Sequence, residues 1–150
     1  MIIFENHYYK NKMQLNFSNT TKLRVRYGET DQMGYCYYGN YAQYFEVGRV
    51  EALREIGMSY RNMEESGIML PVSDFEVKYF KPALYDDEIK IITKLIKVEG
   101  CRLFFEYEIE NEQGKIISTA KTTLVFVLKN TMKPTSPPET FLNLLESYEK

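Results

Sequence analysis

Residues 26–41 read RYGETDQMGYCYYGNY and lead directly into a long segment with helical periodicity. Three glycines in this stretch, Gly28, Gly34 and Gly39, allow the backbone to approach itself or a ligand closely. Asn40 is a favoured helix N-cap residue, and the unpaired amides of a first helical turn stabilise anions. Asp31 is therefore predicted to face an amide-rich helix start, an arrangement that indicates acyl chemistry.

A core-facing helix is predicted directly after this loop, from Tyr41 to Ile56. Its apolar side chains recur on one face at about 100° per residue; they are Tyr41, Ala42, Phe45, Ala52, Leu53 and Ile56. Gly57 suits the position that ends a helix. Upstream, residues 22–27 alternate as a half-buried strand does. Residues 1–20 show no sustained period, so we expect an N-terminal extension followed by a single domain over residues 21–150.

The second half of the chain reads as antiparallel strands. Ser59 is expected to cap a short helix that ends near Gly67. Alternation predicts strands at residues 73–79, 88–99, 102–110 and 115–128, and residues 111–114 have the Asn and Gly of a hairpin loop. A short helix is expected after Pro138. The predicted fold is α+β, with one long central helix wrapped by one antiparallel sheet of about five strands.

Composition excludes several classes of protein. The 150-residue chain carries a net charge of −2, which disfavours a nucleic-acid binder because such proteins need a basic face. Cys36, Cys101 and the single histidine, His7, lack metal-ligand spacing, so neither a metal site nor another cofactor is predicted. Two cysteines are too few for a disulfide framework, and no signal peptide or membrane-spanning segment is recognised. We expect a cytoplasmic protein.

The loop and helix also resemble a known family. Residues 29–34, followed by Tyr38-Gly39-Asn40-Tyr41, resemble the Asp-x-x-Gly…Asn-Tyr signature of hotdog-fold acyl-CoA thioesterases. The branch is that of 4-hydroxybenzoyl-CoA thioesterase and the Tol-Pal-associated thioesterases. Further matches at residues 75–87 and 133–137 extend the resemblance over roughly residues 22–138. It implies the hotdog fold, in agreement with the order of elements above, and hydrolysis of a thioester to a free acid and coenzyme A.

The resemblance implies a role for Asp31 at the thioester carbonyl. Asp31 acts either as a nucleophile that forms a mixed anhydride or as a general base that deprotonates water. The alternative is that Asp31 only closes an Asx turn. Because no Arg or Lys lies between Asp31 and the helix, the oxyanion donors are expected to be the backbone amides of Tyr38 and Gly39. The side chain of Tyr38, where the Tol-Pal-associated branch has His, either contributes its hydroxyl or packs in the core.

Three further residues of this region have alternative explanations. Arg49 falls in the apolar stripe, so an internal pair with Glu46 is one reading, and a Glu46 that orients water or the partner subunit's loop is the other. Cys36 is not expected to be a nucleophile because no histidine stands near it as a base. Glu29 is expected to be a solvated loop carboxylate, able to raise the pKa of Asp31 if both are buried.

The substrate and the assembly complete the prediction. We expect acyl-CoA to contact Asn40, Tyr41 and Glu46, with its phosphates on Lys78 and Lys81, drawn from the basic residues Arg61, Lys78, Lys81, Arg102, Lys129 and Lys133. An exposed sheet edge and the resemblance together imply a homodimer or homotetramer. The alternatives are an acyl-carrier-protein thioesterase and a non-catalytic acyl-binding protein. A hotdog hydratase is disfavoured because its histidine has no counterpart within the resemblance.

Overall fold

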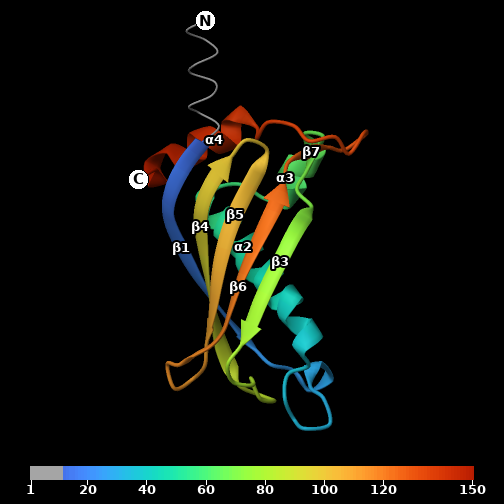
Figure 1. The fold of residues 1–150 in the computed structure, drawn as a ribbon, viewed down its shortest axis with the longest axis vertical. Helices are drawn as coiled ribbons and strands as arrows, with labels where there is room; N and C mark the ends of the chain where they lie inside the picture. The colour runs from blue at the N-terminus through green and yellow to red at the C-terminus, as the bar shows by residue number, and fades with distance from the viewer. Residues whose placement is uncertain (1–11) are drawn as a thin grey trace, which may run out of the picture.

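The computed structural model describes residues 12–150 (Figure 1). The elements that surround the motif loop and the central helix are β1 (Lys12–Arg24), 3₁₀ turns at Tyr27–Glu29 and Tyr38–Asn40, α2 (Tyr41–Ile56), α3 (Tyr60–Glu65), β2 (Ile68–Met69) and β3 (Val72–Tyr79). The remaining elements are β4 (Glu88–Glu99), β5 (Arg102–Glu110), β6 (Ile116–Val125), β7 (Val127–Leu128), α4 (Glu139–Leu145) and a 3₁₀ turn at Glu146–Tyr148.

One antiparallel sheet, in the order β1-β4-β5-β6-β3, curves around α2 (Figure 1). β2 and β7 form a separate two-stranded pair. The predicted inner face is confirmed, because alternate residues of β5 and β6 are buried. The hairpin between these strands is also confirmed, with the Gly114 amide donating to the Asn111 carbonyl at 3.0 Å. The α+β hotdog prediction is therefore confirmed.

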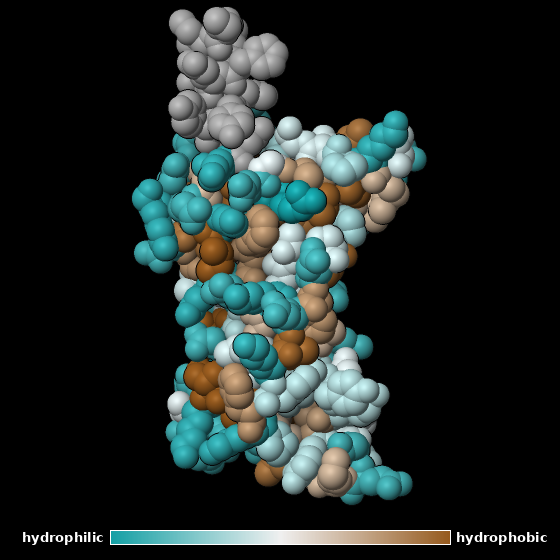
Figure 2. Space-filling model, in the orientation of Figure 1, coloured by the Kyte–Doolittle hydropathy of each residue, from teal (hydrophilic) through white to brown (hydrophobic). Residues whose placement is uncertain are grey.

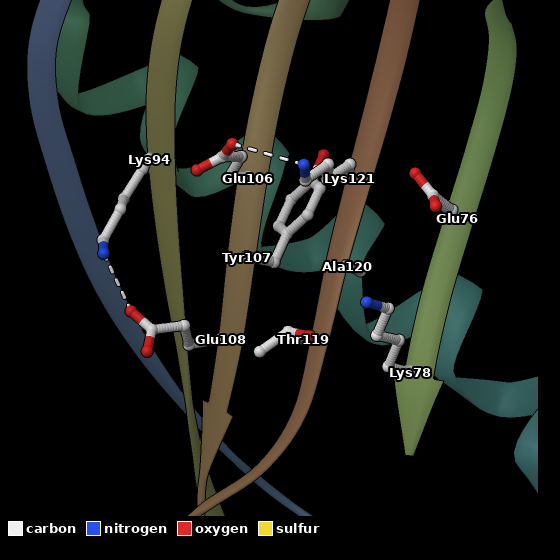
Figure 3. A pocket seen from close by; sticks show the side chains of 9 residues that line it. All are labelled: Glu76, Lys78, Lys94, Glu106, Tyr107, Glu108, Thr119, Ala120 and Lys121. Atoms are coloured by element: carbon white, nitrogen blue, oxygen red, sulfur yellow. Dashed lines mark ion pairs between the residues drawn. The ribbon is translucent and has the colours of Figure 1, made fainter. Parts of the chain in front are cut away.

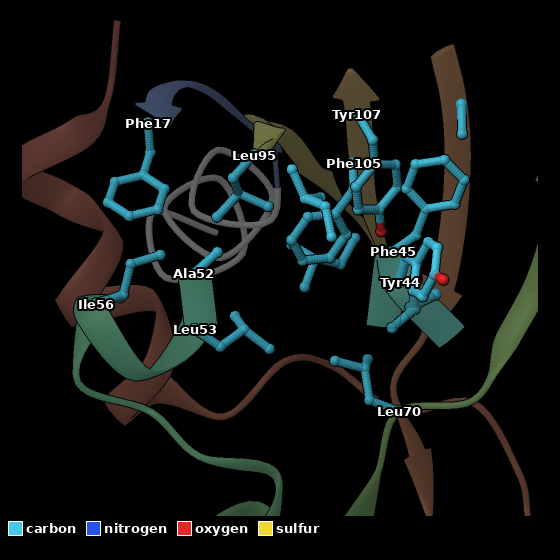
Figure 4. Close-up of a cluster of buried hydrophobic side chains, with 14 of the residues drawn as sticks. Phe17, Tyr44, Phe45, Ala52, Leu53, Ile56, Leu70, Leu95, Phe105 and Tyr107 are labelled. Atoms are coloured by element: carbon cyan, nitrogen blue, oxygen red, sulfur yellow. The ribbon is translucent and has the colours of Figure 1, made fainter. Parts of the chain in front are cut away.

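Helix α2 supplies the centre of the core (Figure 4). Its bounds are those predicted, and it ends at Gly57, whose φ of 110° is a left-handed conformation that favours glycine. The core stripe differs in part from the prediction: Ala42 is exposed, whereas Tyr44 and Gly48 are buried. Gly48 marks a close approach to β4, because a Cβ atom there would lie 2.5 Å from Thr93 Oγ1. The helix therefore sits directly on the sheet.

The start of β1 corrects the sequence prediction. The strand was expected from residue 22, but it begins at Lys12 and pairs with β4 along its length. Met13, Leu15 and Phe17 are buried in the core, so residues 12–20 belong to the sheet. Four consecutive polar residues, 18–21, hide the alternation in the sequence. Residues 1–11 of the expected extension lie outside the described residues, and the division into an extension and one domain stays a prediction.

The C-terminal residues pack beside β1 (Figure 1). Phe141, Leu142 and Leu145 of α4 are buried, which confirms the predicted terminal helix. Beyond it, the Tyr148 ring meets Phe17 edge-on at 4.8 Å between centroids. The Lys150 amide donates to the Gln14 carbonyl at 2.9 Å. This tail covers the first part of the β1 edge that faces away from β4.

The opposite edge strand, β3, is exposed on both faces. It pairs with β6 only, and Val77 alone of its residues is half-buried. Figure 2 shows hydrophobic side chains exposed between hydrophilic ones on the sheet face of the molecule. Phe75 and Tyr79 of β3 nevertheless reach aromatic rings of α2, those of Phe45 and Tyr41.

Candidate active site

The loop between β1 and α2 is a compact turn stacked against the end of the sheet. The Gly34 amide donates to the Asp31 carbonyl at 3.0 Å, and Gly34 has φ = 77°, which favours glycine. The Asp31 amide donates to the Tyr35 carbonyl at 2.8 Å, and the Cys36 amide donates to the Ala83 carbonyl at 2.7 Å. These bonds fix the backbone on either side of the Asp31 side chain.

The Asp31 carboxylate forms the Asx turn that the sequence offered as the alternative. Its Oδ1 atom accepts hydrogen bonds from the amides of Met33 at 2.8 Å and Tyr35 at 3.2 Å. Oδ2 has no hydrogen-bond partner among the described residues. Turn formation therefore uses one oxygen, and the second is available for chemistry. The structural role and the catalytic role are compatible in a single side chain.

The predicted oxyanion donors lie in the 3₁₀ turn that precedes α2. The Asn40 amide donates to the Tyr37 carbonyl at 3.0 Å, and the Tyr41 amide donates to the Tyr38 carbonyl. The amides of Tyr38 and Gly39 have no backbone acceptor within residues 12–150. Asn40 occupies the N-cap position without capping through its side chain; its Nδ2 instead donates to the Glu29 carbonyl at 2.7 Å. The expected side-chain cap is wrong: capping requires Asn40 Oδ1 to accept from a first-turn amide, whereas the bond from Nδ2 to the Glu29 carbonyl orients this side chain toward the loop.

The Tyr38 side chain is 65% exposed, so the alternative that it packs in the core is wrong. Its ring lies 4.7 Å from the Tyr37 ring and 6.4 Å from the Tyr79 ring, measured between centroids. The Tyr79 hydroxyl donates to the Tyr38 carbonyl at 3.1 Å, which ties the turn to β3. The Tyr38 hydroxyl is accordingly accessible from solvent.

An open depression of about 320 Å³ brings several predicted residues together. Its lining comprises Asp31, Met33, Tyr35, Cys36, Tyr38, Tyr41, Tyr79, Phe80, Lys81 and Pro82. Tyr41 is almost wholly buried, and its hydroxyl accepts a hydrogen bond from the Ala83 amide at 3.4 Å. Burial raises the pKa of Tyr41 to about 12, so its hydroxyl stays protonated at neutral pH. The depression is thus largely aromatic, with one carboxylate and one ammonium group.

Lys78 lies elsewhere, on the outer face of the sheet (Figure 3). It lines a hollow of about 280 Å³ that also includes Lys94, Lys121 and three glutamates. Two ion pairs cross this face, from Lys94 to Glu108 at 2.8 Å and from Lys121 to Glu106 at 4.0 Å. The structure therefore separates Lys78 from Lys81, which the sequence had grouped at one substrate-binding rim.

Glu46 is exposed on α2, and its predicted pair with Arg49 is wrong. Arg49 is buried, and its Nε donates to the Tyr60 hydroxyl at 3.0 Å while Nη1 donates to the Tyr107 hydroxyl at 3.3 Å. Tyrosine hydroxyls from α3 and β5 replace the carboxylate because Glu46 points to solvent. The other reading, in which Glu46 orients a water or the partner subunit's loop, stays a prediction.

Glu29 is the residue whose environment the sequence prediction missed. It is not solvated: its side chain is 12% exposed and accepts hydrogen bonds from Arg26 and from the Tyr44 hydroxyl. Burial acts to raise the pKa of Glu29, but the bonds from Arg26 and Tyr44 outweigh burial and hold it below its ordinary value. The signal that could have revealed this is Tyr44, a polar-tipped residue that faces the core beside the loop.

Cys36 is buried below the loop, and its Sγ lies 3.3 Å from the Tyr44 hydroxyl. Burial raises the pKa of the Cys36 thiol, so it is protonated at neutral pH. No group of three or more His, Cys, Asp or Glu within the described part of the chain could hold a metal ion. No described helix is both long and apolar enough to cross a bilayer.

Known proteins match most of the chain, including the loop and the helix that form the candidate site. Residues 25–145 match the family model of the thioesterase-like superfamily. The chain belongs to this superfamily. It is similar to the putative acyl-CoA thioesterase YneP of Bacillus subtilis, with 33% identity over 86% of this chain and 94% of that protein. It is also similar to the acyl-CoA thioester hydrolase YbgC of Escherichia coli O157:H7, with 29% identity over 80% of this chain and 90% of that protein.

The structural comparison agrees. A DHNA-CoA thioesterase structure from Staphylococcus aureus superposes with a TM-score of 0.77 and 39% identity, over 79% of this chain and 80% of that chain. The family prediction is confirmed, and the chain is a thioester hydrolase with the hotdog fold.

Proposed function

We propose that this protein hydrolyses acyl-CoA thioesters at the depression that contains Asp31. The Asp31 carboxylate is the nucleophile or the general base, and the amides of Tyr38 and Gly39 receive the oxyanion. Water supplies the oxygen of the product acid, the carbon–sulfur bond breaks, and coenzyme A leaves as its thiol. The observation that carries this proposal is that the depression is lined by Asp31, whose Oδ2 has no described partner, and by Tyr38 of the 3₁₀ turn before α2, where the amides of Tyr38 and Gly39 have no backbone acceptor within residues 12–150.

Lys81 is the substrate-binding cation that best fits this proposal, because it lines the same depression as Asp31. Asn40 and Tyr41 support the site rather than present free polar groups, since the Asn40 amide nitrogen and the Tyr41 hydroxyl have partners within the protein. Lys78 and Glu46 stay predicted substrate contacts. Neither residue lines the depression within one subunit, so these contacts require a second subunit or an extended ligand.

A homodimer is part of the proposal. β3 has one unpaired edge, and Val72, Phe75 and Tyr79 are each more than two-fifths exposed. Pairing of two β3 strands would satisfy the edge, cover these side chains and bring a second α2 with its Glu46 near the first site. A homotetramer would require a second contact in addition. A cytoplasmic location, expected from the presence of only two cysteines, belongs to the same proposal.

The test is release of free coenzyme A, followed with a thiol reagent, from acetyl, hexanoyl, palmitoyl and 4-hydroxybenzoyl thioesters. We expect turnover by the wild type and a loss of roughly 10²- to 10⁴-fold for Asp31→Asn, with KM little changed. Asparagine keeps the Asx-turn acceptor, so the thermal transition should be retained. Glu55→Gln, which removes an exposed carboxylate from α2, is the control and should be fully active.

The outcomes separate the alternatives. A fully active Asp31→Asn protein would contradict the catalytic assignment. Wild-type protein that is inactive on every coenzyme A ester but cleaves acyl groups from an acyl carrier protein would identify that carrier as the substrate. Binding of acyl-CoA without turnover of either substrate would identify a non-catalytic acyl-binding protein.

A further inference from the structure

Glu29 joins the two arms of the motif loop through its backbone. Its carbonyl accepts hydrogen bonds from the Tyr37 amide at 2.8 Å and from Asn40 Nδ2 at 2.7 Å. Asp31 lies two residues after Glu29, and the Tyr38 amide lies one residue after Tyr37. A single carbonyl therefore sets the spacing between the arm that carries the carboxylate and the arm that carries the predicted oxyanion donors.

The Glu29 side chain fixes that carbonyl in place. Its Oε1 accepts from the Arg26 amide at 2.8 Å and from the Tyr44 hydroxyl at 3.0 Å, and its Oε2 accepts from Arg26 Nη2 at 2.9 Å. With both oxygens occupied and only 12% of the side chain exposed, the carboxylate has little freedom to move. Hydrogen bonds to an ionised acceptor are the stronger class.

Tyr44 connects this cluster to the rigid part of the fold. It is a buried residue of α2, with its ring 5.8 Å from that of Tyr41. Its hydroxyl also lies within hydrogen-bond distance of Cys36 Sγ, on the arm that returns from Asp31. The Tyr44 hydroxyl therefore contacts both arms of the loop, at Glu29 and at Cys36. Because Tyr44 is buried on α2, packing in the core restricts the movement of this hydroxyl.

We propose that Glu29 is a positioning residue, anchored by Tyr44, that holds Asp31 at the correct distance from the amides of Tyr38 and Gly39. The inference rests on the proposed thioesterase function. Glu29 does not line the depression, so it acts through geometry and not by contact with substrate. It is also unsuited to act as an acid, because both of its oxygens accept hydrogen bonds and carry no proton to give.

The competing explanation is that Glu29 only stabilises the fold. The two explanations predict different values of kcat for the molecules of a Glu29 variant that remain folded. A displacement of about 1 Å in a reacting group costs up to about 10²-fold in rate, even when the residue that caused it is remote from the chemistry. A purely structural residue would lower the melting temperature and leave kcat per folded molecule unchanged.

The experiment compares kcat and KM for Glu29→Ala, Glu29→Gln, Tyr44→Phe and the double variant Glu29→Ala/Tyr44→Phe, at a temperature where each is folded by circular dichroism. We expect Glu29→Ala to lower kcat by about 10²-fold with KM nearly unchanged. Glu29→Gln, which keeps an acceptor for Tyr44, should recover part of that loss. The double variant should have the same kcat as Glu29→Ala, because both substitutions remove the same hydrogen bond between Tyr44 and Glu29.

Glu51→Ala is the matched control. Glu51 also pairs with an arginine three residues away, Arg54, but on α2 and away from the loop. The Glu51→Ala variant should leave kcat unchanged. A normal kcat in folded Glu29→Ala would overturn the proposal. If that variant does not fold, a normal kcat in both Glu29→Gln and Tyr44→Phe would overturn it equally.

A second readout does not depend on catalysis. In ¹H–¹⁵N spectra, the amide signals of Asp31, Tyr38 and Gly39 should shift together in Glu29→Gln and Tyr44→Phe and not in Glu51→Ala. If the wild type hydrolyses no thioester, the proposed function fails while these shifts still support the positioning role. Unchanged signals for the three amides in both loop variants would contradict that role whatever the activity.

Discussion

Two carboxylates only two residues apart in the motif loop have different surroundings. The Glu29 carboxylate is enclosed by Arg26 and Tyr44, whereas Asp31 is half-buried and has an oxygen without a described partner. The division follows from local geometry. The Glu29 carboxylate accepts a hydrogen bond from the Tyr44 hydroxyl of α2. The Asp31 carboxylate instead accepts from two amides of its own turn. Both oxygens of Glu29 are therefore used within the loop, whereas Asp31 uses one oxygen for its turn and keeps a second without a described partner.

The pH dependence of stability should carry the signature of Glu29. Its pKa is lowered in the folded protein, so its contribution is present above its unfolded pKa of about 4.3 and is lost as the pH falls through the folded value. At pH 7, Glu29→Gln should lower the free energy of unfolding by about 1–3 kcal/mol. Urea titrations at pH 7 and at pH 3 should show a smaller difference from wild type at pH 3. An equal difference at both pH values would contradict this assignment.

Cys36 should behave as an inert thiol despite its place below the depression. Burial raises its pKa, so little thiolate is present at pH 7.5. In the native protein, Ellman's reagent should modify half-buried Cys101 first and Cys36 only after denaturation. Cys36→Ala should retain most of its turnover. Rapid native modification of Cys36 in a Cys101→Ser background would show that the thiol is more reactive than its burial allows.

At the scale of elements, the sequence predicted the features that depend on neighbouring residues along the chain. The helix from Tyr41 to Ile56 has correct bounds because its apolar period runs along it and Gly57, which ends it, follows directly. The loop around Asp31 was found through its glycines. The partners of Arg49 were not predicted, because the hydroxyls of Tyr60 and Tyr107 belong to elements that lie near Arg49 only in the folded protein. The environment of Glu29 was missed for a related reason: its anchor, Tyr44, belongs to the next element.

The length of β1 gives a prediction at the same scale. Deletion of residues 1–11 leaves every described element intact and should change the melting temperature little. Deletion of residues 1–17 also removes the buried side chains of Met13, Leu15 and Phe17, each worth about 1.5–3 kcal/mol. The longer deletion should therefore unfold the protein or lower its melting temperature sharply by calorimetry. Equal stability of the two truncations would show that the start of β1 is dispensable.

At the scale of the whole molecule, the free edge at β3 leads to a prediction about assembly. Light scattering at micromolar concentration should give twice the chain mass of 17.8 kDa, or a multiple of it. Val72→Glu, which places a charge on the exposed strand, should shift the protein toward monomer and reduce turnover together. Met132→Glu, at a more exposed apolar residue on a loop, should change neither the oligomeric state nor the turnover. A monodisperse, fully active wild-type monomer would exclude a site that needs two subunits.

The two outer strands of the sheet also differ in whether they can add further chains. The tail beside Gln14 occupies the start of the β1 edge, a bulge interrupts that strand after Gln14, and Lys22 and Arg24 place charges near its end. Of the two outer strands of the five-stranded sheet, β3 is the one whose edge has no such cover within residues 12–150. If two copies join at β3, the outer edges that remain would be those of β1, which the tail, the bulge and the charges protect. In such a dimer, the difference between the two edges would stop further strand addition and would protect a sheet-rich protein from forming fibrils as its concentration rises.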